Sequence, residues 1–429
     1  MIAALMLQAD SDILDGWADF KAATVYSMHH AIMYAAPGDE APLQLARERY
    51  ARLQLFCLIN FLDRSLGLLN KPAPNVPGLH ACGATPCAGD LVDWPPTNRD
   101  NYTFSNVSAV PNGYAVKAIS HMSDIAGWLG KTDDAAHYKV VAAQMRSSMV
   151  EHLWNSSSGL FMDGLNVTHS AVHSSIIAAA GGVVTDPTVA AAILKALTER
   201  GLFDGRVLTT CWIAGATLEA IYALGRVSTD GTAAETGLAY MSRSGHRSWI
   251  AMMDDWNATM TMEAWSPVDN PGSPHTGMEG ITFSHPWCSA PAHVIPRLLV
   301  GIEPTERAWK RVRIQPQPGS LVSANFTMPL PMAIASATAI GERLGVRFVQ
   351  TESSFALELS VPSGLSTSKI KVCLPPPMEG SQCGKLTLNS TSVSSKQEGR
   401  FICLASDLVV PGSGMVVTVT RVAAADCEG

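Results

Sequence analysis

The spacing of apolar residues changes once along the chain, and this change limits the fold more than any other feature. Over the first three hundred residues the spacing is helical. One clear stripe follows a candidate N-cap at Thr132 and consists of Tyr138, Val141, Ala142, Met145, Met149 and Leu153. A second runs from Leu43 to Leu62 through Leu45, Tyr50, Leu53, Phe56 and Leu58. Further helices are expected near 14–35, 112–129, 169–180, 187–200, 210–225, 231–243 and 286–301. About nine helices without intervening strands predict a toroid of α-hairpins.

After Gly301 the apolar residues alternate instead. Three segments show the period of two expected of strands, namely 355–361, 370–374 and 415–420, with Pro and Gly marking turns between them. We therefore predict a helical domain over 1–303 and a β-sandwich over 304–429. The Pro/Gly-rich stretch 70–92 is a long loop, a kind of segment that is often functional or disordered.

Charge and hydropathy exclude several classes of partner. Only 16% of the 429 residues are charged and the net charge is −7, which lacks the basic excess of a nucleic-acid-binding protein. No apolar run reaches the ~18 residues that cross a bilayer, so no membrane partner is expected. A neutral or weakly polar ligand fits better. Residues 1–7 are apolar but lack the basic flank of a signal peptide, which suggests that the chain begins inside a larger gene product.

Glycosylation sequons indicate the compartment. Seven of 13 asparagines begin an Asn-X-Ser/Thr triplet, whereas random placement gives about two. They are Asn101, Asn106, Asn155, Asn166, Asn257, Asn325 and Asn389. Either this excess is chance in a Ser/Thr-rich chain, or the protein is a secreted or lysosomal/vacuolar glycoprotein. Asn257 is expected to stay unmodified because it lies in a segment with candidate active-site residues.

The nine cysteines do not define a metal site. Cys82 and Cys87 lie close together in the Pro/Gly-rich loop, and one pair is expected among Cys373, Cys383 and Cys403. Spacing alone leaves the pairing open, and the odd count leaves at least one free thiol. No set of His and Cys has zinc spacing, so neither a metal nor a cofactor is predicted.

Three segments combine aromatic rings with polar groups outside any core-like period: 91–102, 254–267 and 282–288. An aromatic ring covers the apolar face of a pyranose, while carboxylates accept hydroxyl hydrogen bonds or act on the glycosidic bond. These segments predict a sugar pocket. The alternative is that their tryptophans fill the core and their acids cap helices.

Several stretches, in order, resemble bacterial and fungal α-L-rhamnosidases. They are DWPPTNRDNY, GLFMDG with a following HSS, TTCWIAGATLEAIYALGR, RSWIAMMDDWNATMTMEAWSP, FSHPW and LLVGIEPTERAWKRVRIQPQPGSL. The resemblance implies an (α/α)6 six-hairpin toroid followed by the β-sandwich. It also implies an inverting glycosidase that removes terminal α-L-rhamnose, with L-rhamnosyl glycosides as its carbohydrate partners and with no prediction of oligomeric state. In an inverting enzyme an acid protonates the leaving oxygen and a carboxylate activates water, the two carboxyl groups being ~6.5–9.5 Å apart.

The resemblance also implies roles for individual residues. Glu263, in the TMTMEAW motif, is the expected general base, with a helix-end charge or structural ion pair as the alternative. His285 is expected to reach the sugar unless it is a hydrogen-bonded core histidine. Asp93 and Trp94 are expected in the pocket or at its rim, unless they are a capping acid and a core ring. The remaining substrate-binding candidates are Trp256, Trp287, Trp17, Asp19 and Trp265, the last of which is also suited to pack under Glu263.

The family's general acid has no match. Its acidic, Arg-containing motif near the start of the barrel is not found, and no such cluster precedes Asp10. Three explanations stay open: a truncated gene model, a partner chain that supplies the missing wall, or a degenerate remnant. The last would be a carbohydrate-binding protein impaired in catalysis, which is the rival to the hydrolase.

Overall fold

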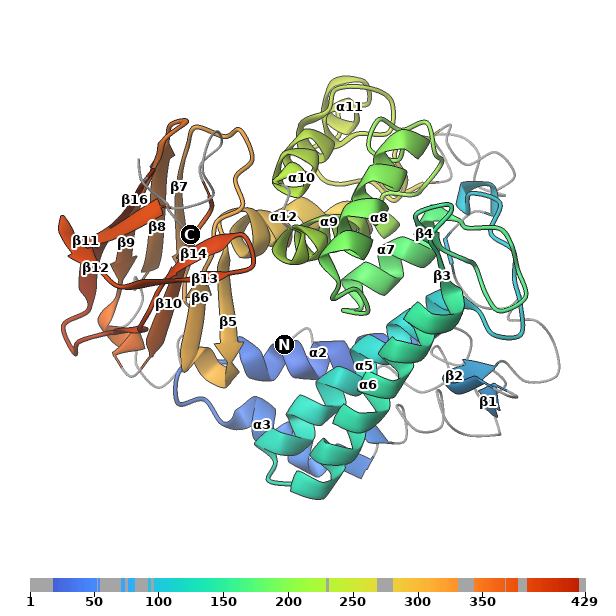
Figure 1. Cartoon of the computed structure of the whole chain (residues 1–429), viewed down its shortest axis with the longest axis horizontal. Helices are drawn as coiled ribbons and strands as arrows, with labels where there is room; N and C mark the ends of the chain where they lie inside the picture. The colour runs from blue at the N-terminus through green and yellow to red at the C-terminus, as the bar shows by residue number, and fades with distance from the viewer. Residues whose placement is uncertain are drawn as a thin grey trace. The chain divides into compact units, whose positions relative to one another are not determined.

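A computed structural model describes residues 18–51, 53–54, 71–73, 76–81, 92–93, 96–228, 231–267, 281–330, 343–366, 368–376 and 384–423. The described chain forms two compact units. The first runs to Ala31 and includes Ala41–Leu224 and Tyr240–Ala290. The second comprises Ile32–Glu40, Gly225–Ala239 and the chain from Pro291 onward. A helical part followed by a β-sheet part confirms the predicted order of the two architectures (Figure 1). No helix among the described residues is both long and apolar enough to cross a membrane.

The described helices follow most of the predicted segments, whereas the stripe predicted over 43–62 lies partly outside the described residues. Its α-helices are α2 (Ala18–Met33), α3 (Ala41–Glu48), α5 (Ala109–Trp128), α6 (Thr132–Leu153), α7 (Val172–Ala180), α8 (Pro187–Arg200), α9 (Ile213–Val227), α10 (Thr232–Ser242), α11 (Trp249–Asp254) and α12 (Ala290–Val294). Short 3-10 turns lie at η2 (Pro96–Asn98) and η3 (Pro286–Cys288). The expected helix over 286–301 is broken into η3, α12 and a π-helical segment, η4 (Ile295–Leu299).

Local chemistry explains where these helices begin and end. Asp186 caps α8 by accepting hydrogen bonds from the amides of Thr188 and Val189, and Pro187 occupies the first turn. The same helix ends at Gly201, whose φ of 81° is left-handed. The predicted N-cap at Thr132 is wrong, because Thr132 is already helical and Lys131 precedes it without a side-chain cap. Asp133 and Asp134 stabilise that first turn through the helix dipole instead.

Apolar faces bury the helices against one another. In α6 the predicted stripe is buried at Tyr138, Ala142, Met145, Met149 and Leu153. Helices α5 and α6 lie side by side (Figure 1). Helix α7 packs against the other side of α5, where a Cβ added to Gly113 would lie 2.8 Å from Cγ2 of Ile177. A side chain larger than hydrogen at 113 would push these helices apart.

The helical region is not free of strands, contrary to the expectation. Two short antiparallel pairs interrupt it: β1 (Lys71–Ala73) with β2 (Val76–Ala81), and β3 (Trp154–Asn155) with β4 (Leu160–Phe161). The β1–β2 pair falls in the Pro/Gly-rich stretch that the sequence analysis treated as a loop. Helix α6 packs on β2, so this hairpin has a helical surface to bury its apolar residues.

Among the described residues, the β part holds two sheets of six strands. The first has the order β13-β14-β10-β6-β5, with β15 beside β10, and the second has the order β12-β11-β16-β9-β8-β7. The strands of the first sheet are β5 (Ile302–Glu306), β6 (Arg311–Ile314), β10 (Lys369–Leu374), β13 (Ser395–Glu398), β14 (Phe401–Leu404) and β15 (Leu408–Val409). Those of the second are β7 (Ser323–Pro329), β8 (Arg343–Gln350), β9 (Ser354–Val361), β11 (Gly384–Leu388), β12 (Thr391–Val393) and β16 (Met415–Ala423). Turn η5 (Arg307–Trp309) lies between β5 and β6, and turn η6 (Ser363–Leu365) lies between β9 and β10.

Alternation along the central strands creates the core between the sheets. In β8 and β9 every second side chain is buried, among them Phe348 and Phe355, whose rings stack with centroids 5.2 Å apart. The sheets meet where Gly384 of β11 lies against Ile402 of β14. A disulfide between Cys373 and Cys403 joins β10 to β14 and supplies the pair expected among the C-terminal cysteines.

An ion cluster binds the end of α9 to the first strand of this unit. Glu303 pairs with Arg226 at 2.9 Å and with Arg297 at 3.2 Å, and Arg313 lies at 4.0 Å. Burial would raise the pKa of Glu303, but Arg226, Arg297 and Arg313 outweigh it and hold that pKa below its usual value. The carboxylate is therefore ionised at neutral pH and fixes the junction between helix and sheet.

Candidate active site around Glu263

Two segments that are 19 residues apart in sequence pair through their backbones around Glu263. The amide of Glu263 donates to the carbonyl of Thr282 at 3.0 Å, and the amide of His285 donates to the carbonyl of Thr261 at 2.8 Å. The hydroxyl of Thr261 donates to the carbonyl of His285 at 2.7 Å. These three bonds hold the TMTMEAW motif beside the FSHPW stretch.

Thr282 orients the carboxylate of Glu263. Its amide and its hydroxyl both donate to Oε2, each at 3.0 Å. The side chain of Glu263 is half-buried, and no hydrogen bond to its Oε1 is found within the described part of the chain. A carboxylate fixed through one oxygen keeps the other available as an acceptor, which is what activation of a water molecule requires.

His285 contacts both Thr282 and the aromatic ring of Trp287. The Thr282 hydroxyl has a single proton, which it donates to Glu263, so it accepts a hydrogen bond from Nδ1 of His285 at 3.3 Å. That arrangement assigns the proton of a neutral His285 to Nδ1 and leaves Nε2 as an acceptor. Nε2 is buried and has no partner among the described residues. The ring meets Trp287 edge-on at 4.5 Å, and Trp287 is 39% exposed. We call Glu263, Thr282, His285 and Trp287 the Glu263 cluster.

A disulfide and aromatic contacts fix the residues that adjoin the Glu263 cluster. A disulfide joins Cys288, at the end of η3, to Cys211, two residues before α9. The indole of Trp249 donates to the carbonyl of Cys288 at 2.6 Å and meets Trp265 edge-on at 5.0 Å. Trp265 is 2% exposed and donates to the carbonyl of Thr209 at 2.9 Å. Its position fits the packing role considered for it under Glu263, and a contact of Trp265 with sugar stays a prediction.

The half-buried cation of Arg243 supports these rings. The guanidinium of Arg243 lies 5.8 Å from the Trp265 ring and 4.8 Å from the Tyr240 ring, and it donates to the carbonyl of Phe203 at 3.0 Å. Burial lowers the pKa of Arg243 and raises the pKa of Tyr240 to about 12. Tyr240 is therefore a neutral phenol at physiological pH. Packing and cation–π contact hold the aromatic rings of Tyr240 and Trp265 in place.

Asp93 connects the DWP motif to the same anchor. Its carboxylate is fully buried; Oδ2 lies 3.0 Å from Nε2 of His173 and accepts from the amide of Thr210 at 3.0 Å, and Oδ1 accepts from the Thr210 hydroxyl. Thr210 precedes Cys211, so Asp93 fixes the segment that carries the Cys211–Cys288 disulfide. These contacts give Asp93 a positioning role, and a direct bond to sugar stays a prediction.

The structure describes the other predicted residues only in part. Trp256 is half-buried, just after α11. Asp19 lies in the first turn of α2, with a side chain outside the described atoms. Trp17 and Trp94 fall outside the described residues. None of the four is brought into the Glu263 cluster by a contact among the residues described, and their roles stay predictions.

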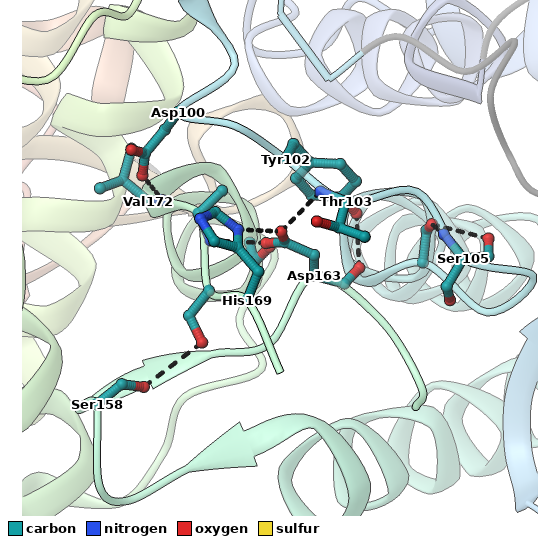
Figure 2. A network of polar contacts seen from close by, with 12 residues as sticks. Asp100, Tyr102, Thr103, Ser105, Ser158, Asp163, His169 and Val172 are labelled. Carbon is teal, nitrogen blue, oxygen red and sulfur yellow. Dashed lines mark hydrogen bonds and ion pairs between the residues drawn. The ribbon is translucent and has the colours of Figure 1, made fainter. Parts of the chain in front are cut away.

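A second polar network, for which no role was predicted, surrounds the start of α7 (Figure 2). Asp163 is fully buried and accepts from the amides of Thr103 and Ala171 at 2.9 and 2.7 Å. Nδ1 of His169 lies 2.6 Å from Asp163. Asp100 accepts from the amide of Val172 at 2.9 Å, and Arg200 pairs with it at 2.9 Å.

Together with the Asp93–His173 pair, this network directs three carboxylates at the first turn of α7, where free amides and the helix dipole favour negative charge. The recognisable signal was an aspartate in the apolar run Leu160–Gly164, followed closely by two histidines. Because the partners are up to 100 residues apart, sequence order alone did not connect them.

One further group of side chains has metal-ligand types. His29, His121 and Asp124 bring their donor atoms within 4.8 Å of one another. Cys373, Glu398 and Cys403 also converge, but the two cysteines are joined in the disulfide and offer no thiolate. Neither group contacts the Glu263 cluster within the described part of the chain.

The described chain thus combines a helical part, a β-sheet part that follows it, and an oriented carboxylate beside aromatic rings. The chain belongs to the bacterial alpha-L-rhamnosidase family: the model of the six-hairpin glycosidase domain matches residues 84–298. The model of the family's C-terminal domain matches residues 301–387. The resemblance inferred from the motifs is thereby confirmed. No curated protein matches the chain in sequence.

Solved structures share the fold at low identity. An alpha-L-rhamnosidase from Dictyoglumus thermophilum covers 94% of this chain with a TM-score of 0.62 and 15% identity. One from Streptomyces avermitilis, complexed with L-rhamnose, covers 94% with a TM-score of 0.60 and 17% identity. One from Aspergillus terreus covers 93% with a TM-score of 0.56 and 15% identity. The chain spans 39%, 32% and 38% of these proteins' own lengths, respectively.

Proposed function

We propose that this protein is an inverting glycoside hydrolase that releases terminal α-L-rhamnose, with Glu263 as its general base. The observation that carries the proposal is the orientation of Glu263 by Thr282. With Oε2 occupied by two donors, Oε1 is the oxygen that accepts a proton from water. The water then attacks the anomeric carbon from the face opposite the leaving group, and the anomeric configuration inverts. The family membership supports rhamnose as the sugar.

The rest of the cluster is suited to hold the sugar. Trp287 offers an exposed ring for the apolar face of a pyranose. Nε2 of His285, with the proton on Nδ1, is an acceptor for a sugar hydroxyl. We propose that His285 and Trp287 bind rhamnose and that Trp256, at the end of α11, borders the same pocket. The general acid is not assigned to any described residue.

The experiment is hydrolysis of an aryl α-L-rhamnoside by the purified chain. We expect Glu263→Gln to lower kcat by about 10²–10⁴-fold, the usual worth of general base catalysis. Glu199→Gln, on the exposed face of α8, is the matched control and keeps the original rate. Equal activity of the two variants would exclude Glu263 as the base. Binding of L-rhamnose in calorimetry without any turnover would favour the rival, a carbohydrate-binding protein.

We further propose that the helices form an (α/α)6 toroid. Antiparallel helix pairs such as α5–α6, and the match to a six-hairpin domain, support it. The experiment is a crystal structure of the protein. An open helical array in place of a closed ring would contradict the proposal.

We also propose that the protein is a secreted or lysosomal/vacuolar glycoprotein. Of the seven sequon asparagines, all but Asn155 are exposed, and Asn155 is half-buried. Asn257 lies six residues before Glu263 and is expected to stay unmodified. Mass spectrometry before and after enzymatic removal of N-glycans, on protein from its native source, tests both points. An unchanged mass would contradict the proposal.

A further inference from the structure

Three donors of the types that bind transition metals meet on helices α2 and α5, away from the Glu263 cluster. His29 comes from α2, while His121 and Asp124 are three residues apart on α5 and therefore share one face. Their ligand atoms all lie within 4.8 Å of one another. Nε2 of His29 is 3.0 Å from Oδ2 of Asp124, and the rings of His29 and His121 lie 3.8 Å apart at 33°.

Three side chains, His29, His121 and Asp124, converge here, whereas an ion pair requires only two. A His29–Asp124 pair would satisfy both partners without a second imidazole, yet the ring of His121 lies directly against that of His29. Zn²⁺ with bonds of ~2.0–2.1 Å holds tetrahedral ligand atoms about 3.4 Å from one another. The His29–Asp124 separation of 3.0 Å is close to this value, and all three ligand atoms lie within 4.8 Å of one another. Two imidazoles and one carboxylate are also a donor set that transition metals prefer over Ca²⁺ or Mg²⁺.

The surroundings define an open site. The ring of Trp128 lies 5.0 Å from that of His29, and the ring of Tyr26 meets that of His121 edge-on at 5.5 Å, so aromatic groups close two sides. The side chain of Asp124 is 55% exposed, which leaves the third side open to water. Lys117, one turn before His121, directs its ammonium to Glu219 at 2.8 Å. Its charge is therefore compensated there.

We propose that His29, His121 and Asp124 form a binding site for a divalent transition metal such as Zn²⁺, with water completing the coordination. Bound metal would join α2 to α5 and stabilise the helical unit. The site is independent of the proposed hydrolase chemistry, because none of its residues contacts the Glu263 cluster within the described chain.

The test is titration of Zn²⁺ into untagged, chelator-treated protein by calorimetry. We expect one saturable site with micromolar affinity and a rise in Tm of about 3 °C at saturation. His121→Gln and Asp124→Asn should each weaken binding by at least about tenfold. His137→Gln, an exposed histidine on α6, is the matched control and should bind as the original protein does.

Two further readouts separate a true site from a folding defect. The variants must have the Tm of the original protein in the absence of metal; the exposed Asp124→Asn change meets this condition even if His121→Gln does not. Electron paramagnetic resonance of bound Cu²⁺ should show two imidazole nitrogens, and one in His121→Gln. Absence of saturable binding, or undiminished binding in both variants, would overturn the proposal.

Discussion

Thr282 donates two hydrogen bonds to one oxygen of Glu263, through its amide and its hydroxyl, each 3.0 Å long. The same hydroxyl accepts from His285, so a single threonine sets the direction of the carboxylate and the tautomer of the histidine. Misplacement of a catalytic group by about 1 Å is worth ~10²-fold in rate, so this contact is expected to matter for turnover.

Thr282→Val tests that relationship. The variant keeps the amide donor and loses the hydroxyl. In the proposed mechanism Thr282 orients Glu263 and makes no contact with the sugar, so we expect kcat to fall by about ten- to a hundredfold while KM changes little. Thr282→Ser restores the hydroxyl and should recover most of the rate. Steady-state kinetics on an aryl α-L-rhamnoside measures both. A serine variant as slow as the valine variant would contradict the positioning role.

Asp93→Asn distinguishes a positioning role from sugar binding. Asp93 is fully buried and bonded to His173 and Thr210. Loss of its charge should lower the free energy of unfolding by about 2–3 kcal/mol. Urea denaturation measures this, with the exposed Asp133→Asn on α6 as a control expected to stay within about 0.5 kcal/mol. Unchanged stability together with a raised KM would instead show that Asp93 binds sugar.

The Cys211–Cys288 disulfide should affect both stability and catalysis. It links residues 77 apart in sequence and fixes η3, which carries Trp287 of the Glu263 cluster, so its removal is expected to cost about 4 kcal/mol and to lower kcat. The Cys373–Cys403 disulfide, in the β-sheet unit, is the matched control: the Cys→Ala pair there should lower stability and leave kcat unchanged. Free thiols at 211 and 288 in non-reducing mass spectrometry would contradict the first statement.

Stability should fall in mildly acidic solution because of His80, in β2. Burial lowers its pKa to about 4 from the usual 6.5, so the folded protein holds His80 neutral while the unfolded chain protonates it. Its contribution is complete above pH 6.5 and is lost as the pH falls toward 4, by about 3 kcal/mol in total. His80→Leu should flatten the stability profile in that window. Parallel profiles for the two proteins, measured by urea denaturation, would contradict this assignment.

Local signals predicted much of the fold. The bounds of α8 follow from Asp186, Pro187 and Gly201, which act within one turn of the helix ends, and β9, β10 and β16 follow from alternation. The break of 286–301 into 3-10, α and π segments was missed. So was the β1–β2 hairpin, whose strands are short and whose stability comes from packing on α6.

The candidate site was predicted only where local sequence signals define it. Motifs placed Glu263 and His285 in one site, but the residue that connects them, Thr282, carries no sequence signal beyond its neighbours. The Cys211–Cys288 disulfide and the Asp93–Thr210 bonds join residues that are 77 and 117 apart. Such pairings depend on tertiary structure, which spacing in one sequence does not encode.

The central claim is that Glu263 activates water in an inverting hydrolysis, and the configuration of the released sugar tests it most directly. Proton nuclear magnetic resonance of an aryl α-L-rhamnoside during turnover should show β-L-rhamnose as the first product, before mutarotation. Glu263→Gln should abolish its appearance on the same time scale, while Glu199→Gln forms it at the original rate. Initial release of the α-anomer, or undiminished turnover by Glu263→Gln, would contradict the account.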